Sequence, residues 1–167
     1  MTACSVRRLA ADAWRAYRDV RLRALGDAPD AFGSTLEAER QRPDAHWAER
    51  LAAGAASAWD CPLVAQAGDA LVGLVWGTID PREPATAHVI QMWVAPESRG
   101  LGCGAMLLDA VVAWAREAGA RRVLLRVTRG DTPAVRLYAR AGFVPDGEPE
   151  PLRPGSAVLA QLMRLEL

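Results

Sequence analysis

Lysine and asparagine are absent from this sequence of 167 residues, so arginine supplies all of its basic side-chain charge. The 20 basic residues equal the 20 acidic residues in number, and the formal net charge at pH 7 is zero. A chain without an excess of one sign creates no strong surface field. We therefore expect it to bind neither nucleic acid nor a membrane surface.

Cysteine is also scarce, and Cys4, Cys61 and Cys103 are odd in number and far apart. This spacing predicts neither a disulfide framework nor a metal site, and it favours a reducing compartment. No apolar run approaches the roughly 20 residues that cross a bilayer. Arg7 and Arg8 interrupt the stretch where a signal peptide would be apolar. We expect a cytoplasmic protein without membrane segments.

Apolar residues make up 51% of the chain, and the length is typical of one domain, which we expect over residues 1–167. Periodic apolar patterns predict helices over 11–25, 43–54, 105–118 and 133–141. Apolar or alternating runs predict strands over 6–9, 62–66, 70–79, 88–94, 123–127, 143–144 and 157–165. This order of elements predicts an α/β fold built on one mixed sheet.

A glycine-rich loop, Arg99-Gly100-Leu101-Gly102-Cys103-Gly104, joins the strand 88–94 to the helix expected from Ala105. Glycines let consecutive backbone N–H groups face an anion, and the helix N-terminus adds positive potential. Arg99 could contact a pyrophosphate directly. A dinucleotide-binding loop is the competing interpretation, but its spacing is G-x-G-x-x-G and an acidic residue should close the next strand. A plain tight turn before a helix is the simplest alternative.

This loop and a later segment together resemble the GNAT superfamily of N-acetyltransferases. Arg99, Gly102 and Gly104 match its pyrophosphate motif Arg/Gln-x-x-Gly-x-Gly/Ala, after a V-x-P segment at Val94-Ala95-Pro96. The family's second motif is Asn-x-x-Ala-x-x-Leu-Tyr-x-x-x-Gly-Phe. The similar segment here is Asp131-Thr132-Pro133-Ala134-Val135-Arg136-Leu137-Tyr138, followed by Gly142-Phe143. The match is best over residues 88–145.

The resemblance implies a mostly antiparallel sheet flanked by helices, with central strands 88–94 and 123–127 splayed apart. Acetyl-coenzyme A would be the co-substrate, without a metal, and an amine would attack it directly in a ternary complex. The strand backbone at Met92, Trp93 and Val94 would bind the pantetheine arm as an added strand. The residues implied to hold the cofactor further include Arg99, Gly100, Leu101, Gly102, Cys103, Gly104, Ala105, Asp131, Ala134 and Tyr138.

Tyr138 is the candidate general acid, because a phenol with a pKa near ~10 keeps its proton at neutral pH and can protonate a leaving thiolate. A buried packing role is the alternative. His88 stands where many family members have a glutamate that deprotonates the acceptor amine. A histidine with a reference pKa near ~6.5 could act as this base, although an exposed strand histidine without function is as plausible.

Two further residues raise chemical questions. Asp131 replaces the family's asparagine, and because a carboxylate only accepts hydrogen bonds, any contact that needs a donor is lost. The sequence favours Asp131 as a helix cap instead. Cys103 lies between two loop glycines, but no histidine partner is evident and the family forms no acyl-enzyme. We therefore expect no nucleophilic role for it.

The acceptor site is the least defined part of the sequence. Asp27 and Asp30 lie in a turn-rich segment that could attract a cation, and Phe32, Trp47 or Trp76 could form an apolar wall. Packing onto the core is an equally good interpretation of these residues. A non-catalytic acyl-coenzyme A binding or sensing module remains an alternative to the enzyme. We expect a monomer or a homodimer, and the apolar last strand, 157–165, could lie in an interface.

Overall fold

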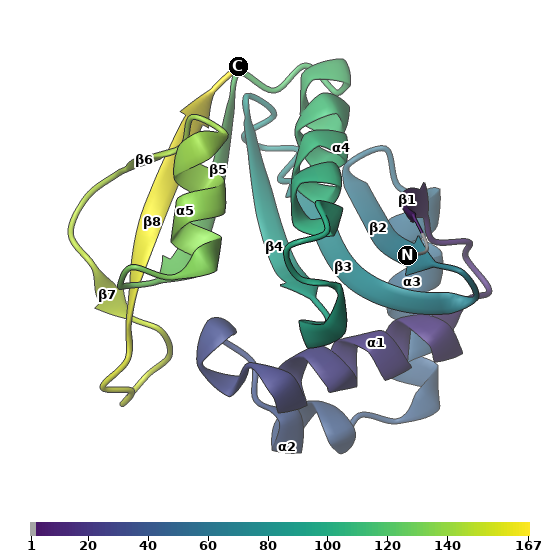
Figure 1. Cartoon of the computed structure of the whole chain (residues 1–167). Coiled ribbons are helices and arrows are strands. Elements are labelled where there is room, and N and C mark those ends of the chain that lie inside the picture. The colour runs from purple at the N-terminus through teal and green to yellow at the C-terminus, as the bar shows by residue number, and fades with distance from the viewer. Residues whose placement is uncertain (1–2) are drawn as a thin grey trace.

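Figure 1 shows the computed structural model, which describes residues 3–167. Helices cover both faces of an open sheet with strand order β1-β2-β3-β4-β5-β8-β6, and β7 also pairs with β8. The strands are β1 (Cys4–Arg8), β2 (Asp60–Ala67), β3 (Ala70–Ile79), β4 (Thr86–Val94), β5 (Arg122–Thr128), β6 (Val144–Pro145), β7 (Glu150–Pro151) and β8 (Leu159–Glu166). The helices are α1 (Trp14–Asp27), α2 (Leu36–Arg40), α3 (Asp44–Ala56), α4 (Cys103–Glu117) and α5 (Pro133–Arg140), with 3-10 turns η1 (Pro29–Ala31) and η2 (Pro96–Ser98).

The pairing of β4 with β5 is the one parallel contact in the sheet over residues 3–167. It joins Thr86–Val89 to Arg122–Leu125 and extends no further. Beyond those residues β4 continues to Val94 and β5 to Thr128, so the two strands separate in a V, which we call the β4–β5 opening. The predicted mixed, mostly antiparallel sheet with splayed central strands is confirmed.

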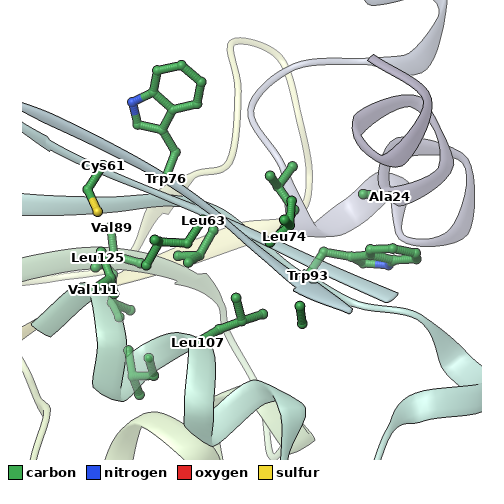
Figure 2. Close-up of a cluster of buried hydrophobic side chains, with 14 of the residues drawn as sticks. Ala24, Cys61, Leu63, Leu74, Trp76, Val89, Trp93, Leu107, Val111 and Leu125 are labelled. Carbon is green, nitrogen blue, oxygen red and sulfur yellow. The ribbon is translucent and has the colours of Figure 1, made fainter. Parts of the chain in front are cut away.

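The two faces of the sheet carry different helices. A Cβ added to Gly77 of β3 would come within 2.6 Å of Val111 and Trp114, so this face packs against α4. The neighbouring Trp76 points the other way, onto Tyr17 of α1, with 5.5 Å between ring centroids. Figure 2 shows Trp76 on one side of the strands and Val111 on the other. We call these the α4 face and the α1 face.

Strand register places the β4 side chains on these faces. Trp76 is opposite Ile90, Gly77 is opposite Val89, and Thr78 is opposite His88. Since directly paired residues share a face and successive residues alternate, His88 and Ile90 belong to the α1 face. In Figure 1, α4 and α5 both lie in front of the sheet, whereas α3 lies behind it.

Most element boundaries agree with the sequence, and the differences have local causes. The first strand occupies 4–8 instead of 6–9. The fourth helix begins at Cys103 rather than Ala105, because Gly102 adopts a left-handed conformation (φ 85°) at the N-cap. The short elements α2 and β7 were not expected, since so few residues show no periodic pattern.

The last strand, β8, lies between other strands of the sheet. β5 pairs along one of its edges, and the two-residue strands β6 and β7 pair with parts of the other. An interface through β8 stays a prediction. In the described part of the chain, no helix combines the length and the apolar character that crossing a bilayer requires.

Candidate active site

The turn between η2 and α4 presents a row of free backbone donors. The N–H groups from Gly100 to Ala105 make no hydrogen bond within residues 3–167, and the first bond of the helix runs from the Met106 N–H to the Gly102 carbonyl at 3.0 Å. Gly100 and Gly102 are both left-handed, with φ of 75° and 85°. Successive donors at a helix N-terminus form an anion-binding site. The predicted phosphate-binding loop therefore has the geometry that this role requires.

Arg99 connects this loop to α1. Its Nε donates to the Val94 carbonyl at 3.0 Å, and its Nη2 donates to Asp27 Oδ2 at 2.5 Å. The same carboxylate oxygen accepts the indole N–H of Trp93 at 2.8 Å. Burial alone would raise the pKa of Asp27, but the hydrogen bonds from Trp93 and Arg99 outweigh it and hold that pKa below its ordinary value.

These contacts change what was expected of both residues. Asp27, considered as a site for a cationic acceptor, already binds Arg99 and Trp93. Arg99 was considered as a contact to pyrophosphate. Two of its N–H donors bind Val94 and Asp27 and so connect β4 to α1, and its side chain is half exposed. Nothing in the sequence indicated this contact, because 72 positions separate Asp27 from Arg99.

Cys103 is 2% exposed and lies in the first turn of α4. Burial, and to a smaller extent the Cys103 thiol, raises the pKa of Cys4 to about 11. A reactive cysteine needs an electropositive, accessible environment that stabilises the thiolate. Cys103 lies at a helix N-terminus but is buried, so it lacks the accessibility that a reactive cysteine needs, and the absence of a nucleophilic role stays a prediction.

The backbone of β4 is open towards β5 beyond Val89. On its other edge, Trp93 pairs with Leu74 and Val94 pairs with Gly73 of β3. The edge facing the β4–β5 opening has no strand partner over Met92–Val94, so an extended arm can bond to it there. The three residues predicted to bind the pantetheine thus lie together at the opening.

A bulge at Gln91 marks the point where β4 leaves β5. Gln91 has φ 58°, and the register with β3 shifts beside it. The Tyr17 hydroxyl donates to Gln91 Oε1 at 3.0 Å, which ties the bulge to α1. A non-glycine residue in this conformation is strained and is retained where the fold over-determines it. Neither Gln91 nor Tyr17 was singled out from the sequence, because only the fold brings them together.

Tyr138 lies in α5 on the α4 face. It is 5% exposed, its ring packs edge-on against Phe143 at 5.9 Å, and burial raises its pKa. A Cβ added to Gly104 would lie 3.3 Å from Leu137 and 3.6 Å from Val94, so α5, the glycine-rich loop and the end of β4 meet at one point. Tyr138 follows Leu137 in the helix that meets the loop, and its raised pKa keeps the phenol protonated.

The cap of α5 is different from the one expected. The Thr132 hydroxyl accepts the Val135 N–H at 3.2 Å and caps the helix. Asp131 instead forms an ion pair with Arg136 at 2.7 Å, and its side chain is 84% exposed. The interpretation of Asp131 as the cap is therefore wrong, because the β-region N-cap position falls one residue later. Ala134, in the first turn, is exposed.

His88 is half-buried on the α1 face, opposite Thr78 of β3 and Leu124 of β5. It lies one residue before the end of the paired segment, at the apex of the β4–β5 opening. Hydrogen bonds from Arg82, and to a smaller extent the nearby His88, lower the pKa of Asp80 to about 2. His88 thus lies at the opening on the α1 face, whereas Tyr138 belongs to a helix on the α4 face.

The three aromatic candidates for an acceptor wall are all buried on the α1 face. Trp47 is 1% exposed and packs edge-on against Tyr17 at 5.6 Å, inside the core. Trp76 donates its indole N–H to Asp60 at 2.9 Å. Phe32 lies under the guanidinium of Arg21, 4.5 Å from the ring centroid. Trp76 also lies under the guanidinium of Arg50, 5.3 Å from the ring centroid.

A cavity of about 260 Å³ lies over β5 and β8, and Arg126, which shares the α1 face with Leu124, forms part of its floor. The other lining residues are Asp146, Gly147, Glu148, Glu150, Ala160 and Leu162. This face of the sheet therefore combines His88 with a partly acidic cavity. Within residues 3–167, no group of three or more potential ligands is arranged to hold a metal ion.

The donor-rich loop and the parallel pair that opens beside it together form a candidate site for an anionic group joined to an extended arm. Comparison with known families identifies the class of protein. The model of the acetyltransferase (GNAT) family matches residues 13–143, and the chain belongs to this family. The resemblance inferred from the two motifs is confirmed.

Individual relatives extend the comparison. The chain is 34% identical over 133 residues to the mycothiol acetyltransferase of Geodermatophilus obscurus, covering 77% of this chain and 40% of that protein. The chain thus spans less than half the length of this curated relative. A GNAT-family acetyltransferase of Streptococcus pneumoniae shares the fold, with a TM-score of 0.85, 20% identity and coverage of 98% and 99% of the two chains. The Vibrio cholerae spermidine N-acetyltransferase, solved with CoA and spermine, has a TM-score of 0.77 at 18% identity, covering 98% of this chain and 95% of that one.

Proposed function

We propose that this chain is an N-acetyltransferase that moves the acetyl group of acetyl-coenzyme A to an amine by direct attack in a ternary complex. The observation that carries the proposal is the row of free N–H groups from Gly100 to Ala105 beside the β4–β5 opening. The first feature suits a pyrophosphate, and the second suits an extended amide-bearing arm. Coenzyme A contains both groups, joined in this order to a thiol.

The chemistry follows from the groups on either side of the opening. The loop N–H groups hold the pyrophosphate, and the free edge of Met92–Val94 aligns the arm so that the thioester lies in the opening. His88, on the α1 face, takes the proton of the acceptor ammonium, directly or through water. The amine nitrogen then bonds to the acetyl carbon, the C–S bond breaks, and Tyr138 donates its proton to the departing thiolate, while the second proton lost by the nitrogen returns the phenol to its protonated form.

The acceptor is proposed only as a class. The curated relative is named for mycothiol and the Vibrio protein for spermidine, and both names describe those proteins. The charge neutrality of this chain does not select an acceptor. The cytoplasmic location stays a prediction, in keeping with three free cysteines that a reducing compartment would preserve.

Acetyl-coenzyme A should raise the unfolding temperature of the protein, whereas NAD and ATP should not. A ligand at about 100 times its dissociation constant stabilises by ~2.7 kcal/mol, which for a chain of this size corresponds to roughly 5–10 °C. The measurement is thermal unfolding with each nucleotide, followed by a thiol-release screen of amines. A shift with NAD alone would contradict the proposal, and binding without release from any amine would indicate a non-catalytic acyl-coenzyme A module.

His88→Gln should lower kcat by about 10-fold or more, because no base remains at this position to deprotonate the substrate amine. The thermal shift with acetyl-coenzyme A should persist. His46→Gln is the matched control, since His46 is the other histidine and lies on α3 against Trp47. Both variants are assayed by initial rates of thiol release. Equal rates in the two variants would assign deprotonation to another group or to water.

A further inference from the structure

Arg21 is buried on α1 without the partners that a buried charge requires. The residue is 5% exposed, and its Nη1 is enclosed with no hydrogen-bond partner within residues 3–167. Burial lowers the pKa of Arg21. Because an uncompensated buried cation costs several kcal/mol or more, such groups are rare and call for an explanation.

The surroundings of Arg21 favour an anion. Its guanidinium lies 4.5 Å from the centroid of the Phe32 ring. Besides burial, Tyr17 and Glu39 raise its pKa and Arg50 lowers it. Glu39 lies 3.9 Å from Arg42 and makes its ion pair there. Arg50 stacks over Trp76 at 5.3 Å and adds a second positive charge.

Arg21 is connected to the β4–β5 opening through Tyr17. It follows Tyr17 by one helical turn, so the two side chains are neighbours on the same side of α1. Tyr17 reaches the Gln91 bulge, where β4 leaves β5, and also packs on Trp76. The free guanidinium nitrogen therefore lies on the α1 face, the same face as His88, where the acceptor of the proposed reaction has to approach.

We infer that Arg21 binds a carboxylate of the acceptor, so that the preferred acceptors are amines that also carry a carboxylate, such as amino acids. This inference rests on the proposed function. A guanidinium presents paired N–H donors that match a carboxylate, and such charge-assisted bonds are strongest where water is excluded. Phe32 fixes the plane of the guanidinium. The unpaired Nη1 is then the donor that the acceptor satisfies.

The test uses pairs of L-amino acids and their carboxamides as acceptors, with thiol release as the readout. The free acids should be the better substrates of the wild-type chain. Arg21→Gln should raise KM for the acids by about 10- to 100-fold and leave KM for the amides and for acetyl-coenzyme A unchanged. Arg21→Lys, which keeps the charge without the paired donors, should recover part of the loss.

The matched control is Arg15→Gln, which removes another α1 arginine that stacks on an aromatic ring, 4.3 Å from the Trp14 centroid, but is exposed. It should change neither KM nor stability. Arg21→Gln should keep or raise the unfolding temperature, because it removes an unpaired buried charge. A clear drop in that temperature with KM unchanged would assign Arg21 a structural role and overturn the inference.

A second readout separates this inference from the proposed function. In the presence of coenzyme A, the acids but not the amides should raise the unfolding temperature of the wild-type chain, and Arg21→Gln should abolish this rise. If the rise occurs but no acceptor releases thiol, the inference stands and the acetyl-transfer proposal fails. If amides are acetylated as well as acids, the enzyme stands and the carboxylate site is refuted.

Discussion

Replacing Tyr138 by phenylalanine is expected to lower kcat by about 10²-fold or more while acetyl-coenzyme A still binds. Tyr138 is 5% exposed and packs against Phe143, so the ring keeps its place when the hydroxyl is removed. Only the proton donor for the departing thiolate is lost. Thiol-release kinetics give kcat, and the thermal shift with acetyl-coenzyme A reports the binding that should survive.

The same residue predicts the pH dependence. Burial raises the pKa of Tyr138 above that of an ordinary phenol, near ~10. A general acid acts in its protonated form, so a raised pKa extends its action to higher pH. The wild-type kcat should therefore show no alkaline decline due to this group below about pH 10. Unchanged kcat in Tyr138→Phe would dismiss Tyr138 as the acid and leave the thiolate to depart unprotonated or to take a proton from water.

Replacing Gly102 by alanine is expected to weaken acetyl-coenzyme A binding by about 10- to 100-fold, because the loop N–H groups would no longer point together at the phosphates. Gly102 has φ 85°, a conformation that costs an alanine about 1–2 kcal/mol. Nothing lies within 4 Å of the Cβ that alanine would add, so the effect comes from the backbone rather than from a clash. Calorimetric titration measures the dissociation constant.

The chain contains a close control for this substitution. Gly119, at the other end of α4, has φ 86° and equally open surroundings. Gly119→Ala should therefore lose a similar amount of folding stability, measured by urea denaturation, without any change in cofactor affinity. If both variants bind acetyl-coenzyme A equally well, the orientation of the loop at Gly102 does not determine phosphate binding.

The sequence by itself determined the features that depend on neighbouring residues. The apolar periods located the long helices and strands, and the glycine-rich loop with the later Leu137-Tyr138 and Gly142-Phe143 segment was sufficient to identify the family. Helix formation, turn chemistry and the exposure of loop N–H groups arise within a few residues of the chain. A single sequence therefore carries most of these signals, although the short α2 and the Thr132 cap of α5 were not predicted.

Only the tertiary structure decided which distant residues meet. Asp27 holds Arg99 across 72 positions, and Tyr17 holds the Gln91 bulge across 74. The burial of Arg21 likewise depends on the packing of α1, since an arginine on a helix is ordinarily exposed. Such contacts depend on how whole helices and strands pack together, so they cannot be predicted from the residues adjacent in the sequence. The glycine-rich loop could thus be singled out from the sequence, whereas Arg21, on which the proposed acceptor site depends, required the fold.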